Sequence, residues 1–317
     1  MEHLEKPAGR VALTIGNFDG VHIGHQAIIA SLVEHAHKRN YTSVVMTFEF
    51  HPLRLINPLK APAVLMSLSR RLEIIEQFGV DIAVIAHCTE SLLNMSREEF
   101  VSKILVEHFQ LGVIVEGENF RFGHQHRGNI DYLHSEGKRF GFDTIKIPAR
   151  KIEIPEYGKQ TISSTLIRLL VQDGRVDLAE KCLGRRYELI GTVVAGAGRG
   201  KGLGFPTANL QCGELMLPKQ GVYACKAYVG GKSFLASANI GPAPTFNQYR
   251  TGVEVHIIDF EGKLYGSKLR LEFYQRIRDI RRFTDITELR KQVADDIKQT
   301  KNVVMYSGRK KDFIERI

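Results

Sequence analysis

The sequence has no apolar run that approaches the roughly 20 residues needed to span a bilayer. Residues 1–10 also lack the apolar core of a secretory signal. We therefore expect a cytoplasmic protein without a membrane partner. Cysteine is scarce: the four cysteines are widely spaced and form no Cys-x-x-Cys pair, which argues against both a disulfide framework and a zinc ribbon.

The length and composition are those of an ordinary folded protein with more than one core. At 317 residues the chain exceeds the roughly 100–200 residues of one domain, so two domains are expected. The net charge of +9 is uneven, with +1 in residues 1–186 and +8 in residues 187–317. Such a charge suits nucleic acid or anionic small molecules such as nucleotides.

The first half alternates strand-like and helix-like segments, the pattern of β-α-β units on a parallel sheet. Strands are expected at residues 11–15, 43–48, 82–86, 113–115 and 144–147. Helices are expected at residues 25–39, 70–78 and 97–108. The first half is therefore predicted to be an α/β Rossmann-like domain.

The second half consists of short strands separated by glycine and proline turns, which indicates a small antiparallel β-barrel. The expected strands are residues 189–194, 221–229, 253–260 and 268–273, followed by a C-terminal helix at 285–298. We place the boundary after the helical segment 176–183. The predicted domains are residues 1–185 and 186–317.

Residues 14–25 join the first strand to the first helix, where phosphate sites form in open α/β sheets. Glycines at positions 16, 20 and 24 allow a ligand to approach the backbone closely. His22 and His25, three residues apart, can face one ligand and offset the charge of a departing pyrophosphate. An isolated pair of this kind is usually two surface histidines or half a metal site, but the strand, glycine turn and helix start favour nucleotide binding.

At this point the sequence resembles the nucleotidylyltransferase superfamily, whose His-x-Gly-His motif matches residues 22–25. Residues 47–52 and 162–168 resemble motifs of the FMN adenylyltransferase module of bacterial FAD synthetases. The resemblance implies that His22 and His25 are catalytic. It implies ATP contacts from Gly16, Asn17, Phe18, Asp19, Gly24, Ser163, Ser164, Thr165 and Arg168. Taken alone, the Ser-Ser-Thr run also fits a helix cap.

Residues 117–123, Gly-Glu-Asn-Phe-Arg-Phe-Gly, resemble a family segment that borders the nucleotide and the flavin. The resemblance implies that Asn119 and Phe120 bind flavin, because an amide and an aromatic ring can bond to and stack on a ring system. A purely structural aromatic turn is the alternative for Phe120 and Phe122. His124 and His126 have no obvious metal-binding partner, and we leave them unassigned.

A second motif places five glycines within residues 196–204, followed by Phe-Pro-Thr-Ala-Asn at 205–209. Such a loop can fold over a polyphosphate, although glycine loops are more often flexible linkers. It is not a Walker loop, because no Gly-Lys-Ser/Thr ending is present. In an extended segment the oxygens of Thr207 and Asn209 lie on one side and can share Mg²⁺ with ATP phosphates.

Residues 205–209 resemble the signature of riboflavin kinases, and residues 221–224, 241–246 and 253–260 resemble further segments of that family. The resemblance implies ATP contacts from Gly198, Lys201 and Gly204, metal binding by Thr207 and Asn209, and flavin contacts from Arg278 and Phe283. It also implies that Glu254 is the catalytic carboxylate. The whole chain is thus expected to phosphorylate riboflavin to FMN and to adenylylate FMN to FAD, with ATP as co-substrate, Mg²⁺ as cofactor and pyrophosphate as product.

Two other classes of protein remain to be weighed. The His-Ile-Gly-His tetrapeptide also occurs in class I aminoacyl-tRNA synthetases, but no Lys-Met-Ser-Lys-Ser-like loop follows. The basic stretch 276–282 suggests nucleic-acid binding, yet Asp279 and apolar residues interrupt it, as in a salt-bridged structural segment. We therefore expect riboflavin, FMN and ATP as partners, no nucleic acid, and a monomer or weak homo-oligomer.

Overall fold

The computed structural model describes residues 9–195, 205–245 and 248–314. The chain forms two compact units, Met1–Ser164 and Thr165–Ile317. The division lies before the boundary expected at residue 185, and the helix at residues 176–183 packs on strands of the second unit. Whether residues 1–185 and 186–317 fold as separate domains stays a prediction.

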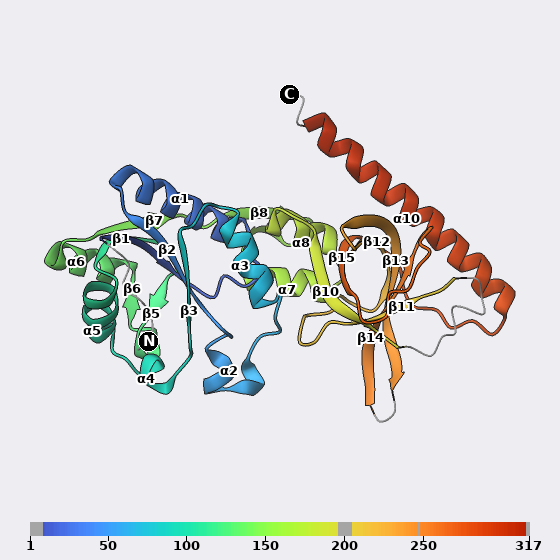
Figure 1. The fold of residues 1–317 in the computed structure, drawn as a ribbon, viewed down its shortest axis with the longest axis horizontal. Helices are drawn as coiled ribbons and strands as arrows, with labels where there is room; N and C mark the ends of the chain where they lie inside the picture. Colours follow the sequence, from blue (N-terminus) through green and yellow to red (C-terminus); the bar gives the residue numbers. More distant parts are fainter. Residues whose placement is uncertain (1–8, 196–204, 246–247, 315–317) are drawn as a thin grey trace. The chain divides into compact units, whose positions relative to one another are not determined.

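The first unit is built on a parallel sheet (Figure 1). Its strands are β1 (Val11–Ile15), β2 (Thr42–Phe48), β3 (Ile82–Ala86), β4 (Leu111–Gly117) and β7 (Asp143–Ile147), in the order β3-β2-β1-β4-β7. All four pairings are parallel, as the alternating sequence pattern predicts. Because the order reverses at β1, the ends of β1 and β4 border the crevice where ligands bind in such sheets.

Helices cover both faces of this sheet (Figure 1). On one face α1 (Ile23–Arg39) and α3 (Leu68–Glu76) pack with residues such as Ala12 and Val113. On the other face, η2 (Phe100–His108) and α6 (Ile130–Phe140) pack with Leu13 and Ile114. The strands are therefore apolar on both sides, which is what a covered parallel sheet requires.

Several short elements complete the first unit. The helix expected at 97–108 is divided into α5 (Arg97–Glu99) and the π-helix η2. The elements absent from the prediction are α2 (Leu53–Ile56), η1 (Pro58–Lys60), α4 (Glu90–Leu93), η3 (His124–His126), α6 and the hairpins β5 (Arg121–Phe122) with β6 (Gly128–Asn129) and β8 (Lys151–Ile154) with β9 (Gly158–Thr161). Apart from α6, these elements are too short to show a period, which is the main signal in a sequence. Helix α6 has 11 residues with an apolar face and an Asn129 N-cap, so its sequence carried a signal that the prediction overlooked.

The second unit is a closed antiparallel barrel, as predicted (Figure 1). The strands are β10 (Tyr187–Val194), β11 (Ala208–Gln211), β12 (Gly221–Val229), β13 (Lys232–Thr245), β14 (Gln248–Ile257) and β15 (Lys268–Arg278), in the order β10-β11-β14-β13-β12-β15. Alternate residues such as Tyr223, Val255 and Phe273 fill the interior. The sequence did not indicate β13, which is rich in small residues and contains two prolines.

Among the described residues, three helices belong wholly or mostly to the second unit. They are α7 (Ser164–Gln172), α8 (Val176–Leu183) and α10 (Ile286–Ile314). The bounds of α8 agree with the expected segment, whereas α10 extends well beyond the expected end at residue 298. Helix α10 packs on β12, β13 and β15, and α8 packs on β10 and β15.

We expect a fragment of residues 187–317 to be less stable than a fragment of residues 165–317. The shorter fragment lacks α8, whose side chains Val176, Leu178 and Leu183 are buried. Burial of each such side chain contributes about 1.5–3 kcal/mol, so the free energy of unfolding should fall by roughly 4 kcal/mol or more. Urea unfolding followed by circular dichroism measures this difference. Equal unfolding midpoints would instead support a domain that begins near residue 186.

Candidate functional sites

The first candidate site lies in the loop between β1 and α1. Phe18 and Val21 take left-handed φ values of 46° and 34°, and the Val21 N–H donates to the Phe18 carbonyl over 2.9 Å. Asp19 is 8% exposed, and its carboxylate accepts the backbone N–H groups of Leu65 at 3.1 Å and Met66 at 3.3 Å. The predicted ATP-binding residue Asp19 therefore also holds the loop in its tight conformation.

The two histidines of the motif lie directly against each other. His22 is the N-cap of α1 rather than part of its first turn, and its Nδ1 accepts the His25 N–H over 3.2 Å. The ring centroids are 3.6 Å apart and the planes differ by 19°. A Cβ atom at Gly24 would lie 3.1 Å from the His22 ring, so a glycine at this position leaves room for the stack.

The backbone at Asn17 is held by Thr47 on β2, which is itself held by Arg71, a buried arginine on α3 that the sequence did not single out. The Thr47 hydroxyl donates to the Asn17 carbonyl over 3.3 Å. Arg71 donates to the Thr47 hydroxyl at 3.0 Å and to the Phe48 carbonyl at 2.9 Å. Arg71 is 5% exposed, and its burial lowers the pKa of the guanidinium. The sequence did hold a signal for the burial of Arg71: it lies three residues before Ile74, on the apolar face of α3.

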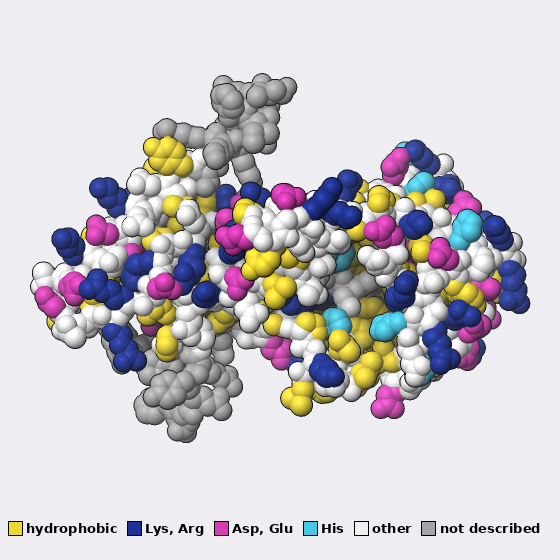
Figure 2. All heavy atoms as spheres, turned by 180° about the vertical axis from the view of Figure 1, so that it is seen from behind, with side chains coloured by type: hydrophobic (Ala, Val, Ile, Leu, Met, Phe, Trp, Pro, Cys, Tyr) yellow, Lys and Arg dark blue, Asp and Glu magenta, His cyan; other side chains and the backbone are white. Residues whose placement is uncertain are grey.

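The side-chain oxygen of Asn17 in this loop is available to bind a ligand. The Asn17 side-chain oxygen is buried and has no hydrogen-bond partner among the described residues. A buried acceptor without a partner is costly, so a bound donor group would stabilise it. Figure 2 shows histidine and hydrophobic side chains around a hollow on one face of the first unit.

Ser164 of the Ser-Ser-Thr segment contacts the same loop. The Ser164 hydroxyl donates to the Asp19 carbonyl over 2.7 Å, and Ser164 is the first residue of α7. Ser163 is half-buried. Thr165 is exposed and Arg168 half-buried, and both belong to the second compact unit. The structure therefore brings Ser164 to the histidine loop, while ATP binding by all four residues stays a prediction.

The aromatic segment after β4 has one buried and one half-buried ring. Phe122 is 6% exposed and lies 5.4 Å from the Phe100 ring and 5.6 Å from the Phe120 ring, which favours a core role for Phe122. Phe120 is half-buried at the edge of the same cluster, and Asn119 is exposed. Asn119 and Phe120 are thus accessible to a ligand, as are Glu118 and Arg121 of the same segment.

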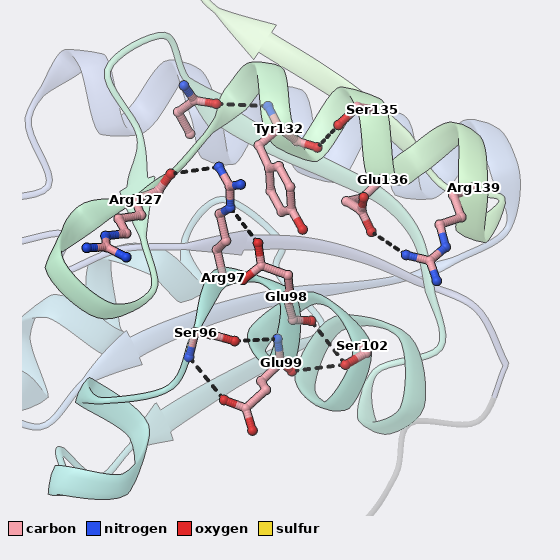
Figure 3. Close-up of polar contacts among 11 residues, drawn as sticks. Ser96, Arg97, Glu98, Glu99, Ser102, Arg127, Tyr132, Ser135, Glu136 and Arg139 are labelled. Atoms are coloured by element: carbon pink, nitrogen blue, oxygen red, sulfur yellow. Dashed lines mark hydrogen bonds and ion pairs between the residues drawn. The ribbon is translucent and has the colours of Figure 1, made fainter.

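Arg97 contacts the loop that follows this segment (Figure 3). The Arg97 guanidinium lies 4.2 Å from the centre of the Tyr132 ring, bonds to Glu98 at 2.7 Å and donates to the Arg127 carbonyl at 3.4 Å. His124 and His126 lie in η3, directly before Arg127. In the part of the chain that the structure describes, no group of three or more His, Cys, Asp or Glu side chains is arranged to hold a metal ion.

The second candidate site is a row of polar side chains across three barrel strands. Glu254 on β14 pairs with Asn209 on β11 and with Asn239 on β13. Directly opposed residues share one face of a sheet, with Cβ atoms about 4.5–5.5 Å apart. Glu254 alternates with buried Val253 and Val255, so the row lies on the outer surface of the barrel. The sequence did not single out Asn239, because strand register was needed to find it.

The side chains of this row are available to a ligand. Glu254 is exposed and the two asparagines are half-buried, and within the described residues none of the three has a side-chain hydrogen bond. The neighbouring pair on the same face is Gly241 with Gly252, which leaves a flat surface beside the carboxylate. A Cβ atom at Gly241 would lie 2.6 Å from the Ile280 side chain, so Ile280 borders this surface.

A histidine two residues along β14 holds the segment that carries Thr207. His256 Nδ1 lies 2.9 Å from the Pro206 carbonyl oxygen, and its ring meets the edge of Phe205 at 5.6 Å. Thr207 is exposed and immediately precedes β11. The predicted ATP-binding residues Gly198, Lys201 and Gly204 lie outside the described residues.

The donor set beside Glu254 fits a magnesium ion. Thr207, Asn209 and Glu254 offer hydroxyl, amide and carboxylate oxygens, and Mg²⁺ prefers oxygen ligands completed by substrate phosphates and water. The pairing of Asn209 with Glu254 brings two of these donors together on one face.

Arg278, expected to contact flavin, is bound to the C-terminal helix. Its Nε donates to Asp296 Oδ1 at 2.8 Å and its Nη2 to Oδ2 at 2.7 Å, and Asp296 is 4% exposed. The Arg278 guanidinium lies 6.0 Å from the Phe283 ring. Arg276 pairs with Asp279 at 2.5 Å, so the interpretation of the stretch 276–282 as salt-bridged is confirmed. Flavin binding by Arg278 and Phe283 stays a prediction.

The two units and their sites define a transferase with a nucleotide site in a parallel sheet and a second site on a β-barrel. The family model for FAD synthetase matches residues 4–166, and the family model for riboflavin kinase matches residues 183–304. The chain belongs to the bifunctional riboflavin kinase/FMN adenylyltransferase family.

Relatives of similar length carry that description. The Haemophilus influenzae bifunctional riboflavin kinase/FMN adenylyltransferase is 35% identical over 92% of this chain and 93% of its own length. The Escherichia coli K12 protein of the same description is 36% identical over 92% of each chain. Both correspond to this chain across its two units.

A solved structure extends the similarity to the fold. A crystal structure described as a macrolide-efflux protein from Streptococcus pneumoniae has a TM-score of 0.86 at 28% identity and covers 95% of this chain and 96% of that one. That description differs from the names of the curated relatives. Among the residues that the structure describes, no helix of this chain has the length and apolar character to cross a membrane.

Proposed function

We propose that this chain makes FAD from riboflavin in two ATP-dependent steps, each at its own site. The barrel site phosphorylates riboflavin to FMN, and the histidine site transfers an adenylyl group from ATP to FMN. The stacked pair of His22 and His25 beside the β1–β4 crevice supports the adenylyl step. The row formed by Asn209, Glu254 and Asn239 supports the kinase step.

In the kinase step Glu254 acts as the general base. The 5′-hydroxyl of the ribityl chain attacks the γ-phosphorus of ATP, the bond to the β-phosphate oxygen breaks, and the hydroxyl proton passes to the Glu254 carboxylate. The carboxylate is exposed and has no hydrogen-bond partner among the described residues, so it can orient the alcohol and accept its proton. Asn239, directly opposite on β13, is placed to donate a hydrogen bond to the same substrate.

Thr207 and Asn209 would hold Mg²⁺ together with ATP phosphates. When bound, the ion offsets negative charge on the phosphates during transfer. His256 keeps the chain before Thr207 in place by its contact with the Pro206 carbonyl. The proposed ATP-binding residues of this site are Gly198, Lys201 and Gly204.

In the adenylyl step a phosphate oxygen of FMN attacks the α-phosphorus of ATP, and pyrophosphate leaves as the bond between the α- and β-phosphates breaks. No proton has to be moved from the nucleophile, so the protein contributes alignment and charge stabilisation. In this proposal His22 and His25 stabilise the negative charge that develops on the departing pyrophosphate. Asn17 and Ser164 lie in the same loop region, and Asn119 and Phe120 follow the neighbouring strand.

The remaining proposals concern the setting of the enzyme. Riboflavin, FMN and ATP are its small-molecule partners, and it acts in the cytoplasm as a monomer or weak homo-oligomer without nucleic acid. The proposed ATP contacts at the histidine site are Gly16, Asn17, Phe18, Asp19, Gly24, Ser163, Ser164, Thr165 and Arg168. The proposed flavin contacts are Asn119, Phe120, Arg278 and Phe283.

The direct test is to incubate the purified full chain with riboflavin, ATP and magnesium and to separate the flavins by chromatography. We expect FMN to appear first and FAD to follow, with pyrophosphate released in step with FAD. A matched reaction with chelator in place of magnesium should form neither product. A folded protein that forms no FMN, or that forms no FAD from supplied FMN, would contradict the corresponding half of the proposal.

A further inference from the structure

Strands β1 and β4 separate before either of them ends. Their register runs from Val11 opposite Leu111 to Leu13 opposite Ile114 and stops there. Strand β1 continues to pair with β2 as far as Ile15, and β4 continues to pair with β7 as far as Gly117. The gap therefore opens at the point where the strand order reverses, beside the loops that carry both sets of proposed ligand contacts.

The side chain of Glu116 lies in this gap. Glu116 Oε1 accepts the Ile15 N–H over 2.7 Å and the Thr14 hydroxyl over 3.4 Å. The Glu116 carboxyl group thus accepts the Ile15 N–H, which would bond to a β4 carbonyl if the pairing of β1 with β4 continued. Ile15 directly precedes Gly16, and Glu116 lies three residues before Asn119, so one side chain connects the two loops.

Glu116 is 2% exposed, and burial raises the pKa of its carboxyl group well above the ordinary value. Strand β1 presents no ionisable side chain, and β7 carries Asp143 and Lys146, both of which are exposed. Helix α1, which packs against β4, carries His22 and His25 at its start. Burial is the largest cause of the raised pKa, the hydrogen bonds from Ile15 and Thr14 offset it only in part, and no charged group contributes to the shift.

We propose that Glu116 is a positioning residue for adenylyl transfer, holding the end of β1 as a neutral carboxylic acid and so fixing the loop at Gly16–Asn17 relative to the loop at Asn119–Phe120. The inference rests on the proposed adenylyl site. Both hydrogen bonds end on Oε1, which leaves Oε2 to carry the proton. Ionisation would place an unpaired charge in the gap, and its hydration would move the two loops apart.

Two substitutions separate this role from simple packing. Glu116→Gln keeps the acceptor oxygen and a neutral donor group, so FAD formation from supplied FMN should stay within about threefold of wild type. Glu116→Val removes the acceptor and leaves the Ile15 N–H unpaired. Because small displacements of reacting groups can cost up to about 10²-fold, FAD formation should fall by about tenfold or more. FMN formation by the same purified chain is the internal control and should not change in either variant.

The pH profile gives a readout that packing alone does not affect. With FMN and ATP supplied, FAD formation by the wild type should decline as pH rises through the pKa of Glu116, and the Gln variant should lack this decline. The raised pKa means that the folded state retains a proton that the unfolded state has released. The contribution of Glu116 to the free energy of unfolding is therefore fully present below the pKa of the unfolded state. It is lost as pH rises through the pKa of the folded state. The melting temperature of Glu116→Gln relative to wild type should accordingly increase with pH.

The outcomes distinguish this inference from the proposed function. A wild type that makes no FAD at any pH overturns both. A wild type that makes FAD, with a Gln variant of identical pH profile and melting behaviour, overturns only the role of Glu116. A folded Gln variant as inactive as the Val variant also overturns it, because an ionised carboxylate would then be required. If Glu116→Val fails to fold, the comparison of Glu116→Gln with wild type still decides.

Discussion

Replacing Glu254 with glutamine is expected to lower the rate of FMN formation by about 10²–10⁴-fold, the usual contribution of a general base. This corresponds to roughly 3–5 kcal/mol of activation free energy. The amide keeps the shape of the side chain but cannot accept the proton of the ribityl hydroxyl. Riboflavin affinity should change little, because Glu254 is exposed and supports no other described residue. Steady-state rates and a fluorescence titration with riboflavin measure both quantities.

The controls for this variant lie in the same chain. FAD formation from supplied FMN should be unchanged, because it takes place in the other unit. Glu261→Gln removes an exposed carboxylate a few residues beyond β14 and should leave both activities intact. If Glu254→Gln retains more than about a tenth of the wild-type rate, it falls outside the range for a general base. Glu254 would then only orient the substrate, and the bound metal and the asparagines would have to suffice.

His25→Ala is expected to lower FAD formation from FMN by about 10²–10³-fold or more while FMN formation from riboflavin stays near the wild-type rate. Removing one group that stabilises transition-state charge typically has an effect of about this size. The His25 ring stacks on the His22 ring, with the centroids 3.6 Å apart. His22 is the N-cap of α1, and His25 lies in the first turn of that helix. Separate assays with riboflavin and with FMN measure the two rates.

His22 needs a second variant, because it also caps α1. Its Nδ1 accepts the His25 N–H, so His22→Ala removes a cap as well as an imidazole. His22→Asn keeps a good N-cap and should be folded yet equally poor in FAD formation. His37→Ala, an exposed position on the same helix, is the matched control and should be silent. Equal loss of both activities in a folded His25 or His22 variant would argue against the assignment.

Much of the fold could be predicted because its signals are local. The strand at Val11–Ile15 and the helix at Val176–Leu183 agree with the expected bounds. Each combines a clear apolar period with a glycine or polar stop, which requires no knowledge of distant residues. Strand β13 was missed because its small residues and prolines show no strong alternation of apolar and polar side chains. The strand forms through its pairing with β12 and β14.

By itself the sequence determined the class of each half and the motifs that carry the chemistry, because a strand followed by a glycine turn, paired histidines and a helix start is a local pattern. Only the tertiary structure decided which side chains stand together. Asn239 lies opposite Glu254, Arg71 supports Asn17, and Glu116 fills the gap beside Ile15 through strand register and burial. These contacts join residues that are far apart in the sequence, and burial, which raises the pKa of the Glu116 carboxyl group, exists only in the folded chain.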